Sequence, residues 1–382
     1  MTEPTSQPSS GQPSSGQPSS GQASPVTSTR NGLLLWLGEL VSRKGSDLYL
    51  TYGAPPMVRV HDELVPISPH SLDAAMINKI IGELTTHEQQ GEFYESREFN
   101  MSLDLGRLGR FRVNLLYQRQ HQAVVIRRID TVIPDMGSLG LPDILATLAQ
   151  EKRGLILFVG GTGSGKSTSM AAMIDYRNQT TPGHILTIED PIEYIHEHKK
   201  SLVTQREVGV DTKSYDAALK NSLRQKPDVI LIGEIRDREV MRHAINICET
   251  GHLAMATLHA NNSAQAIERI VSFFDVSERH HVLLNLSFNI RAIISQRLVR
   301  RKGGGRVLAH EILVNNEGTS SLIRDGRIAD LKAAIAGGQQ DGMMGFNGSL
   351  LSLYRRGLID AEVATAESDD RKSMVEAIEN CS

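Results

Sequence analysis

The sequence predicts an α/β protein in which a mostly parallel sheet is preceded by a small α+β domain and followed by a helical segment. Two observations carry this prediction. Between residues 142 and 315, apolar runs of strand length alternate with helical runs, which is the rhythm of βαβ units. Between residues 30 and 130, several strand-like runs occur in pairs joined by short polar turns, as in antiparallel hairpins.

The N-terminal residues 1–29 differ from the rest in composition. Gln-Pro-Ser-Ser-Gly occurs three times in succession at residues 7–21. Pro, Gly and Ser at this density cannot bury apolar surface, so we expect a disordered low-complexity tail.

Residues 30–130 carry the pattern of the small domain. Leucines recur at helical spacing from Leu33 to Leu40, which predicts an amphipathic first helix. The later predictions are a strand at 46–51, a hairpin at 58–60 and 64–67, a helical stretch at 71–95, a strand at 99–105 and a hairpin at 110–117 and 123–129. Residues 131–141 contain Pro134, Gly137 and Gly140 and are interpreted as a linker.

The region 142–315 carries the alternating pattern. The predicted strands are 155–159, 184–188, 201–204, 228–233 and 252–257, and the predicted helices are 142–150, 168–177, 214–225 and 237–249. After Asn262 we expect mainly helices, with one further strand at 306–314. Residues 316–382 are expected to be helical.

Composition limits the function classes. Of 382 residues, 40% are hydrophobic and 4% aromatic, and the net charge is −3. This balance gives no support for nucleic-acid binding, which usually requires a basic surface. Cys248 and Cys381 lack metal-ligand spacing and indicate a reducing, cytoplasmic location. No apolar run approaches the roughly 18 residues of a membrane span, so we expect no membrane insertion.

One motif joins the predicted strand 155–159 to the helix that follows. Its residues are Gly160, Gly161, Thr162, Gly163, Ser164, Gly165, Lys166, Ser167 and Thr168. They fit G-x-x-x-x-G-K-[ST], in which backbone N–H groups surround a phosphate, the lysine reaches the β- and γ-phosphates and the serine hydroxyl ligates Mg²⁺. A simple turn would explain the glycines but not Lys166 and Ser167. The sequence therefore predicts a site for ATP and Mg²⁺.

Carboxylates follow two of the predicted strands. Glu189, Asp190 and Glu193 follow the strand at 184–188, where they could orient water or hold Mg²⁺, although Asp-Pro is also common at turns. Glu234 follows the strand at 228–233, and Gly233 stands where a Walker B aspartate is expected. Glu234 could reach Mg²⁺ through water.

Histidine and arginine provide further candidates. His252 and His259 bracket the strand at 252–257 and lack the spacing of a helical zinc site, so His259 is interpreted as a γ-phosphate sensor. Arg112 and Arg127 lie on the hairpin of the small domain with two other arginines. They could form a solvated face or act as arginine fingers on a neighbouring subunit.

Together these motifs resemble a known family. GGTGSGKST, TIEDPIEYIH, ILIGEIRD and TGHLAMATLHANN, in this order, are similar to the secretion-type hexameric ATPases of type II and type IV secretion and type IV pili. The segments 46–48, 109–113, 204–209 and 295–298 resemble the pilus-retraction branch, PilT and PilU. PilT is expected to contain Ala-Ile-Arg-Asn-Leu-Ile-Arg-Glu, whereas residues 318–325 are Gly-Thr-Ser-Ser-Leu-Ile-Arg-Asp, which favours PilU.

The resemblance implies a RecA-like core at 142–315 and a PAS-like domain at 30–130. It implies a hexameric motor that hydrolyses ATP to power pilus retraction and twitching motility; the alternative is an ATP-binding accessory subunit of a PilT ring. The implied partners are identical subunits, a PilT-like ATPase and the inner-membrane pilus platform protein, on the cytoplasmic side of that membrane. The implied site residues are Gly165, Lys166 and Ser167 for phosphate and Mg²⁺, Glu189 or Glu193 as hydrolytic glutamate, Glu234 as Walker B carboxylate, His259 as nucleotide contact, and Arg112 and Arg127 as fingers.

Overall fold

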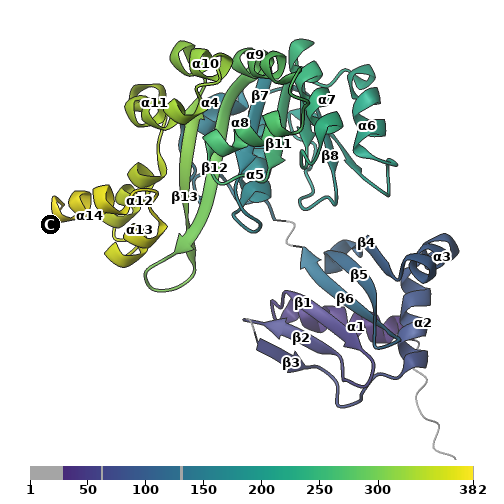
Figure 1. The fold of residues 1–382 in the computed structure, drawn as a ribbon. Helices are drawn as coiled ribbons and strands as arrows, with labels where there is room; N and C mark the ends of the chain where they lie inside the picture. Colours follow the sequence, from purple (N-terminus) through teal and green to yellow (C-terminus); the bar gives the residue numbers. More distant parts are fainter. Residues whose placement is uncertain (1–28, 62, 130–131, 382) are drawn as a thin grey trace, which may run out of the picture. The chain divides into compact units, whose positions relative to one another are not determined.

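The computed structural model describes residues 29–61, 63–129 and 132–381 (Figure 1). The chain divides into two compact units between Arg128 and Ile129. The expected disordered tail lies outside the described residues except for Thr29, where the first helix begins. Within the described ranges, no helix is long and apolar enough to cross a lipid bilayer.

The first unit contains a six-stranded sheet in the order β3-β2-β1-β6-β5-β4. Its strands are β1 (Asp47–Thr51), β2 (Met57–Val60), β3 (Glu63–Pro66), β4 (Glu98–Asp104), β5 (Arg110–Gln118) and β6 (His121–Ile129). Helices α1 (Thr29–Ser42), α2 (Ala74–Leu84) and α3 (His87–Ser96) contribute to one apolar core with the sheet, which includes Leu37, Leu48, Ile80, Phe93 and Phe111.

The helical stretch predicted at 71–95 is two helices. Asp73 caps the start of α2, and Thr85 caps its end. Thr86 then starts α3 with a capping box, in which Thr86 and Gln89 exchange side-chain to backbone hydrogen bonds. This exchange satisfies N–H groups that a helix start leaves unpaired, so a new helix begins without a loop.

The second unit contains a seven-stranded sheet in the order β13-β12-β7-β11-β10-β8-β9. Its strands are β7 (Gly154–Val159), β8 (Gly183–Glu189), β9 (Ser201–Glu207), β10 (Val229–Ile232), β11 (Leu253–Leu258), β12 (Ile290–Arg300) and β13 (Arg306–Val314). All neighbouring pairs are parallel except β12 and β13, which are antiparallel. The predicted fold class is confirmed.

Helices cover both faces of this sheet (Figure 1). Helices α4 (Ile144–Ala149) and α5 (Lys166–Thr180) pack on one face, with Ile156 and Phe158 of β7. The other face carries α6 (Tyr215–Ser222), α7 (Arg238–Glu249), α8 (Ser263–Ser272) and α9 (Arg279–Asn289), which pack with Leu155 and Leu157. Alternate residues of β7 thus pack into the cores on opposite faces of the sheet, because successive side chains of a strand point to opposite faces.

Strand β12 was not predicted, because only one strand was expected after Asn262. Helix α9 ends at Asn289 and β12 begins at the next residue, so no turn residue separates them. Val282, Leu286, Ile290, Ile293 and Ile294 also maintain helical spacing across this boundary. The apolar pattern alone therefore suggested a longer helix.

The helices after Asn315 divide between two clusters. Helices α10 (Glu317–Arg324) and α11 (Leu331–Gly337) pack on the sheet core through Ile323 and Leu331. Helices α12 (Phe346–Arg355), α13 (Ala361–Glu367) and α14 (Arg371–Glu379) share a separate core with Val299 and Ala309 of the β12–β13 pair.

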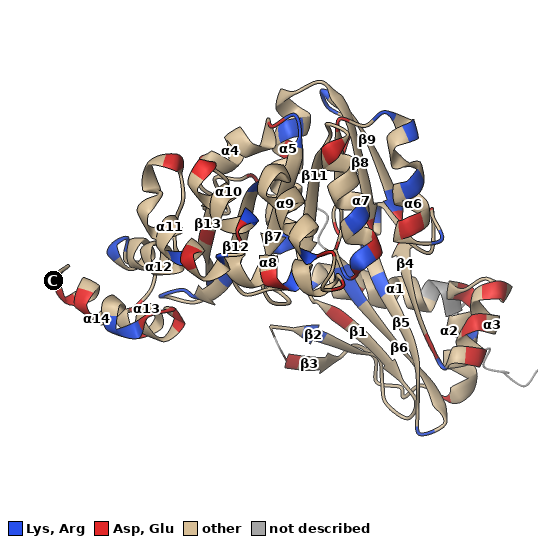
Figure 2. Ribbon diagram, turned by 45° about the horizontal axis from the view of Figure 1, so that its top comes forward, with Lys and Arg blue, Asp and Glu red and all other residues tan. Residues whose placement is uncertain are grey.

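Arg297 of β12 connects the sheet to this separate cluster. Its Nη2 lies 2.8 Å from Asp369 Oδ1, and its guanidinium carbon lies 3.8 Å from the centre of the Phe346 ring. Acidic and basic residues are interspersed on α6 and on α14 (Figure 2). These helices therefore present mixed charge rather than a field of one sign.

Candidate nucleotide site

The phosphate loop follows β7, every residue of which is buried. Gly160 is tightly enclosed, because a Cβ there would lie 2.6 Å from the backbone oxygen of Gln296. Gly165 has a φ of +91° directly before α5, a conformation that side-chain-bearing residues rarely adopt. Both glycines are therefore required by the local backbone, and together they let the loop enter α5 directly.

Lys166 is the first residue of α5 and is only 8% exposed. Its Nζ donates to the backbone oxygens of Gly160 and Gly161, each at 2.9 Å. Burial lowers the pKa of the Lys166 ammonium, and the charges of Glu234 and Glu193 oppose that shift. The ammonium thus lies across its own loop, beside two of the predicted carboxylates.

The first turn of α5 carries further hydroxyl groups. Ser167 and Thr168 are half-buried, and Thr168 Oγ1 lies 2.9 Å from the Tyr194 hydroxyl. On the next residue, Ser169 Oγ accepts a 2.7 Å hydrogen bond from Gln296 Nε2. Gln296 lies on β12 and was not predicted as a site residue, since β12 itself was not predicted.

Glu189 ends β8, at the carboxyl edge of the parallel strands. Its Oε1 accepts hydrogen bonds from Thr187 Oγ1 at 2.6 Å and from Gln205 Nε2 at 3.3 Å. Burial raises the pKa of the Glu189 carboxyl to about 7, against these two hydrogen bonds, and the charge of Glu193 raises it further. A carboxyl that titrates near neutrality can accept a proton in catalysis. Glu193 is exposed on the loop that follows.

The chain beyond β10 explains why Gly233 replaces an aspartate. A Cβ on Gly233 would lie 2.8 Å from the Tyr215 hydroxyl and 3.2 Å from the Cα of Glu189. An aspartate side chain would not fit, so the carboxylate is supplied by the next residue, Glu234. Burial also raises the pKa of the Tyr215 hydroxyl.

Glu234 is the centre of a chain of polar and charged groups. Its Oε1 lies 3.2 Å from His259 Nε2, and its Oε2 accepts from Arg236 Nε at 2.9 Å. Arg236 Nη1 in turn lies 3.1 Å from Asp190 Oδ2. Arg236 was not predicted as a site residue, although it stands two residues beyond Glu234.

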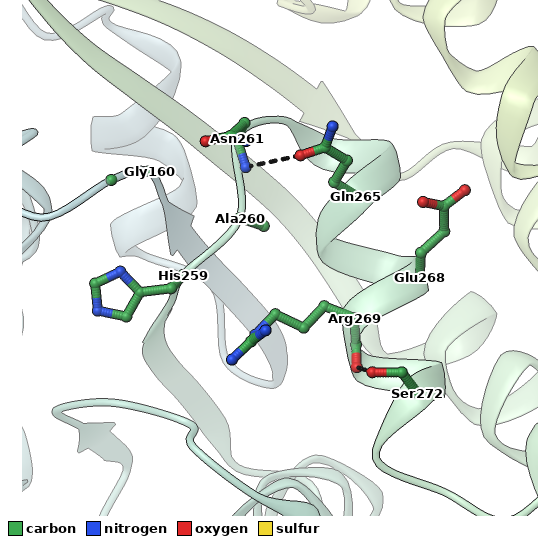
Figure 3. Close-up of a pocket in the computed structure, with 9 residues that line it drawn as sticks. Gly160, His259, Ala260, Asn261, Gln265, Glu268, Arg269 and Ser272 are labelled. Carbon is green, nitrogen blue, oxygen red and sulfur yellow. Dashed lines mark hydrogen bonds between the residues drawn. The ribbon is translucent and has the colours of Figure 1, made fainter.

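An open pocket of about 500 Å³ lies beside the phosphate loop (Figure 3). Gly160 and Gly161 form one side, and His259 with residues of α8 forms the other. Figure 3 shows the Arg269 side chain extending from α8 toward the segment that carries His259, just beyond β11. The volume is within the range of small-molecule sites, about 300–1,000 Å³. Arg269 was not predicted as a site residue, because the sequence argument considered only residues at the ends of strands and not those of the helix that follows.

The structure brings the phosphate loop, Glu189, Glu193, Glu234 and His259 to one edge of the second unit. They follow β7, β8, β10 and β11, which are neighbours in the sheet with their carboxyl ends aligned. This arrangement is the general position of ligand sites in open α/β sheets.

The two predicted fingers belong to the first unit. Arg112 on β5 and Arg127 on β6 are both exposed, on the sheet face opposite Phe111 and Ile126. Arg127 Nε lies 2.8 Å from Asp47 Oδ1 of the neighbouring strand. Their action on a nucleotide stays a prediction.

A comparison with known families matches residues 38–333 to the family described as Type II/IV secretion system protein. The chain belongs to this family. Among its relatives, this family member is 46% identical to the type IV pilus ATPase PilU of Pseudomonas aeruginosa over 336 residues, 88% of both chains. It is 41% identical to PilT of the same organism, a type IV pilus retraction ATPase, over 84% of this chain and 93% of PilT.

Solved structures agree with the sequence relatives. The crystal structure of the pilus retraction motor PilT with bound ADP has a TM-score of 0.84 and 41% identity, and covers 90% of this chain and 99% of PilT. The ATPase DotB of Legionella pneumophila has a TM-score of 0.80 at 25% identity, over 90% of this chain and 97% of DotB. These likenesses confirm the predicted PilT/PilU branch and, with it, an ATPase.

Proposed function

We propose that this chain is a PilU-like motor that hydrolyses ATP to power the retraction of type IV pili and twitching motility. One observation carries the proposal. In a chain 46% identical to PilU, the phosphate loop and the acidic and histidine side chains expected of an ATPase lie at the aligned ends of neighbouring strands. This site is intact in composition, which favours turnover over simple nucleotide binding.

Lys166, with the loop 160–165, would hold the phosphates. Its ammonium already donates to two carbonyls of the loop, and a phosphate oxygen is a stronger, charged acceptor. The Ser167 hydroxyl and the Glu234 carboxylate are hard oxygen donors of the kind that Mg²⁺ prefers, Glu234 acting through water. When bound, Mg²⁺ would neutralise charge on the phosphate oxygens.

Glu189 and Glu193 are the two candidates for the glutamate that accepts a proton from the attacking water. Glu189 is held by Thr187 and Gln205 and has a pKa raised to about 7 by burial, which suits a base at neutral pH. Glu193 is exposed and acts electrostatically on Lys166. His259, beside Glu234, would contact the γ-phosphate.

The ring and its partners are part of the same proposal. Six identical chains would form a ring in which Arg112 and Arg127 of the PAS-like domain (30–130) reach a nucleotide as fingers. Hydrolysis in the RecA-like core (142–315) would move the two domains about the linker at 131–141, with the helical segment 316–382 attached to the core. The ring would dock on the pilus platform protein at the cytoplasmic face of the inner membrane, with a PilT-like ATPase as a second partner.

The test is ATP hydrolysis by the purified chain, with Lys166→Ala as the control. We expect phosphate release in the native chain and none above background in the control. Equal release by both would reject the site. A pilus-retraction assay in a strain that lacks only this protein then tests the motor role, and unchanged retraction would reject it.

A second function, that of an accessory subunit in a PilT ring, is favoured by one observation. Ser320, which replaces an arginine of the expected PilT motif, donates to the Ser287 backbone oxygen at 2.8 Å and lies against α9. The segment that could couple hydrolysis to pilin is thus altered. This function predicts little hydrolysis by the chain alone, and more hydrolysis by a PilT-like ATPase together with the chain than by that ATPase alone. Stimulation by DNA would instead indicate a nucleic-acid translocase.

A further inference from the structure

Glu311 on β13 is a buried acidic residue outside the nucleotide pocket. It is 5% exposed and pairs in register with Ser295 of β12. Its Oε1 accepts hydrogen bonds from the Ser263 backbone N at 2.8 Å, from Ser263 Oγ at 2.7 Å and from Ser295 Oγ at 3.2 Å. Within the part of the chain that the structure describes, it forms no ion pair, so these hydrogen bonds offset the cost of burying the group.

Two of these hydrogen bonds come from the first residue of α8. A helix start leaves about four backbone N–H groups without a partner. Asn262 caps one of them, because its side chain accepts from the Gln265 N at 2.9 Å, and Glu311 satisfies the N–H of Ser263. An acidic group is favourable at this end of a helix. Glu311 therefore fixes the start of α8 to the β12–β13 pair.

Helix α8 is one wall of the pocket beside the phosphate loop. Gln265 and Arg269 face that pocket from α8, and His259 precedes the helix by only a few residues (Figure 3). The Asn261 N also donates to Gln265 Oε1 at 3.3 Å, which ties this short connection to the helix. A shift of the start of α8 would therefore move His259 relative to Glu234.

The phosphate loop, on the opposite side of the pocket, is also contacted from the β12–β13 pair. Gln296, the neighbour of Ser295 on β12, donates to Ser169 in α5, and its backbone oxygen packs against Gly160. Successive residues of a strand point to opposite faces, so Ser295 lies on the side of α8 while Gln296 lies on the side of α5. The β12–β13 pair thus sets the spacing between the phosphate loop and the His259 wall.

We propose that Glu311 is a positioning residue of the ATPase site, which holds the start of α8 so that His259 faces the phosphate loop. The inference rests on the proposed ATPase function. The hydrogen bonds of Glu311 go to Ser263 and Ser295, whereas Lys166 and its loop are held by β7, α5 and Gln296. Loss of the Glu311 contacts therefore reduces turnover, while the binding of ADP, which lacks the γ-phosphate, is little changed.

The test compares Glu311→Gln, Glu311→Ala and a matched control. Gln keeps an acceptor oxygen but removes the charge, and we expect kcat to fall about threefold to tenfold. Ala removes the acceptor, and we expect a fall of about 10-fold to 100-fold, as for a misplaced catalytic group. The control is Glu317→Gln, which removes an exposed acidic residue from the start of α10 and leaves kcat unchanged. The Kd for a fluorescent ADP analogue is expected to stay within about twofold in all three.

Two results would overturn the inference. One is native kcat in Glu311→Gln and Glu311→Ala, both folded by circular dichroism. The other is a loss of ADP affinity that parallels the loss of kcat, which would indicate a general structural role. If Glu311→Ala does not fold, Glu311→Gln alone decides.

A readout that does not need hydrolysis separates this inference from the proposed function. Amide hydrogen exchange at residues 259–266 should be faster in Glu311→Gln than in the native chain, and unchanged in Glu317→Gln. If the native chain does not hydrolyse ATP, the proposed function fails while this exchange still tests the positioning role. Native exchange rates in Glu311→Gln would then reject that role.

Discussion

Replacing Glu189 by Gln should make the protein more stable and less active at the same time. Burial raises the pKa of this carboxyl from 4.5 to about 7. Between about pH 4.5 and pH 7, Glu189 is therefore protonated in the folded chain and ionised in the unfolded chain. Its contribution to stability is fully present below pH 4.5 and is lost as the pH rises through 7.

The size of this loss follows from the shift. A difference of about 2.5 pKa units corresponds to about 3 kcal/mol at pH 8, at 1.36 kcal/mol per unit. Gln is uncharged at every pH and nearly the same shape. We therefore expect Glu189→Gln to be more stable than the native chain by up to about 3 kcal/mol at pH 8, with the difference shrinking toward zero near pH 4.5. Turnover should fall by about 100-fold or more if Glu189 is the base.

The assay is urea unfolding followed by far-ultraviolet circular dichroism, at several pH values and one protein concentration, without nucleotide. The matched control is Glu193→Gln, which removes the same charge from an exposed position on the following loop. It should not reproduce the gain in stability at pH 8. A native chain as stable as Glu189→Gln at pH 8, or a difference that grows toward acid pH, would refute the reasoning.

Three further predictions concern the rest of the site. Lys166→Ala should abolish binding of a fluorescent ATP analogue and phosphate release, and native hydrolysis in this variant would exclude the phosphate-loop assignment. Arg112→Ala should lower kcat by about 10³-fold, as for a lost arginine finger, while the Kd for ATP stays nearly unchanged; if kcat is also unchanged, Arg112 belongs to a solvated face. Gly233→Ala should lower Tm by several degrees, because its Cβ would lie 2.8 Å from the Tyr215 hydroxyl, and Tyr215→Phe should restore part of the loss. No recovery in the double variant, measured by thermal unfolding, would mean that the clash is with the Glu189 backbone instead.

The parts of the site that are local in sequence could be predicted. The phosphate loop is one continuous motif between a strand and a helix, and Glu189, Glu234 and His259 each follow an apolar strand. In a parallel sheet the ends of such strands must meet at one edge. The α/β fold class was also predictable, because the strands and helix of each βαβ unit are consecutive in the sequence.

The parts that depend on distant packing could not be predicted. Gln205 reaches Glu189 from the neighbouring edge strand, and Gln296 reaches Ser169 from a strand more than a hundred residues further along the chain. Neither residue type signals such a contact. The presence of Gly233 instead of an aspartate was visible in the sequence, but its cause, the Tyr215 hydroxyl, required the tertiary structure.

The two hydrogen bonds from Lys166 to the carbonyls of Gly160 and Gly161 tie the position of the ammonium to the path of the loop. Both acceptors are backbone oxygens, so they do not depend on the side chains that the loop carries. The cation and the loop backbone therefore form one unit. A change that displaced residues 160 and 161 would move the positive charge with them, instead of altering the loop alone.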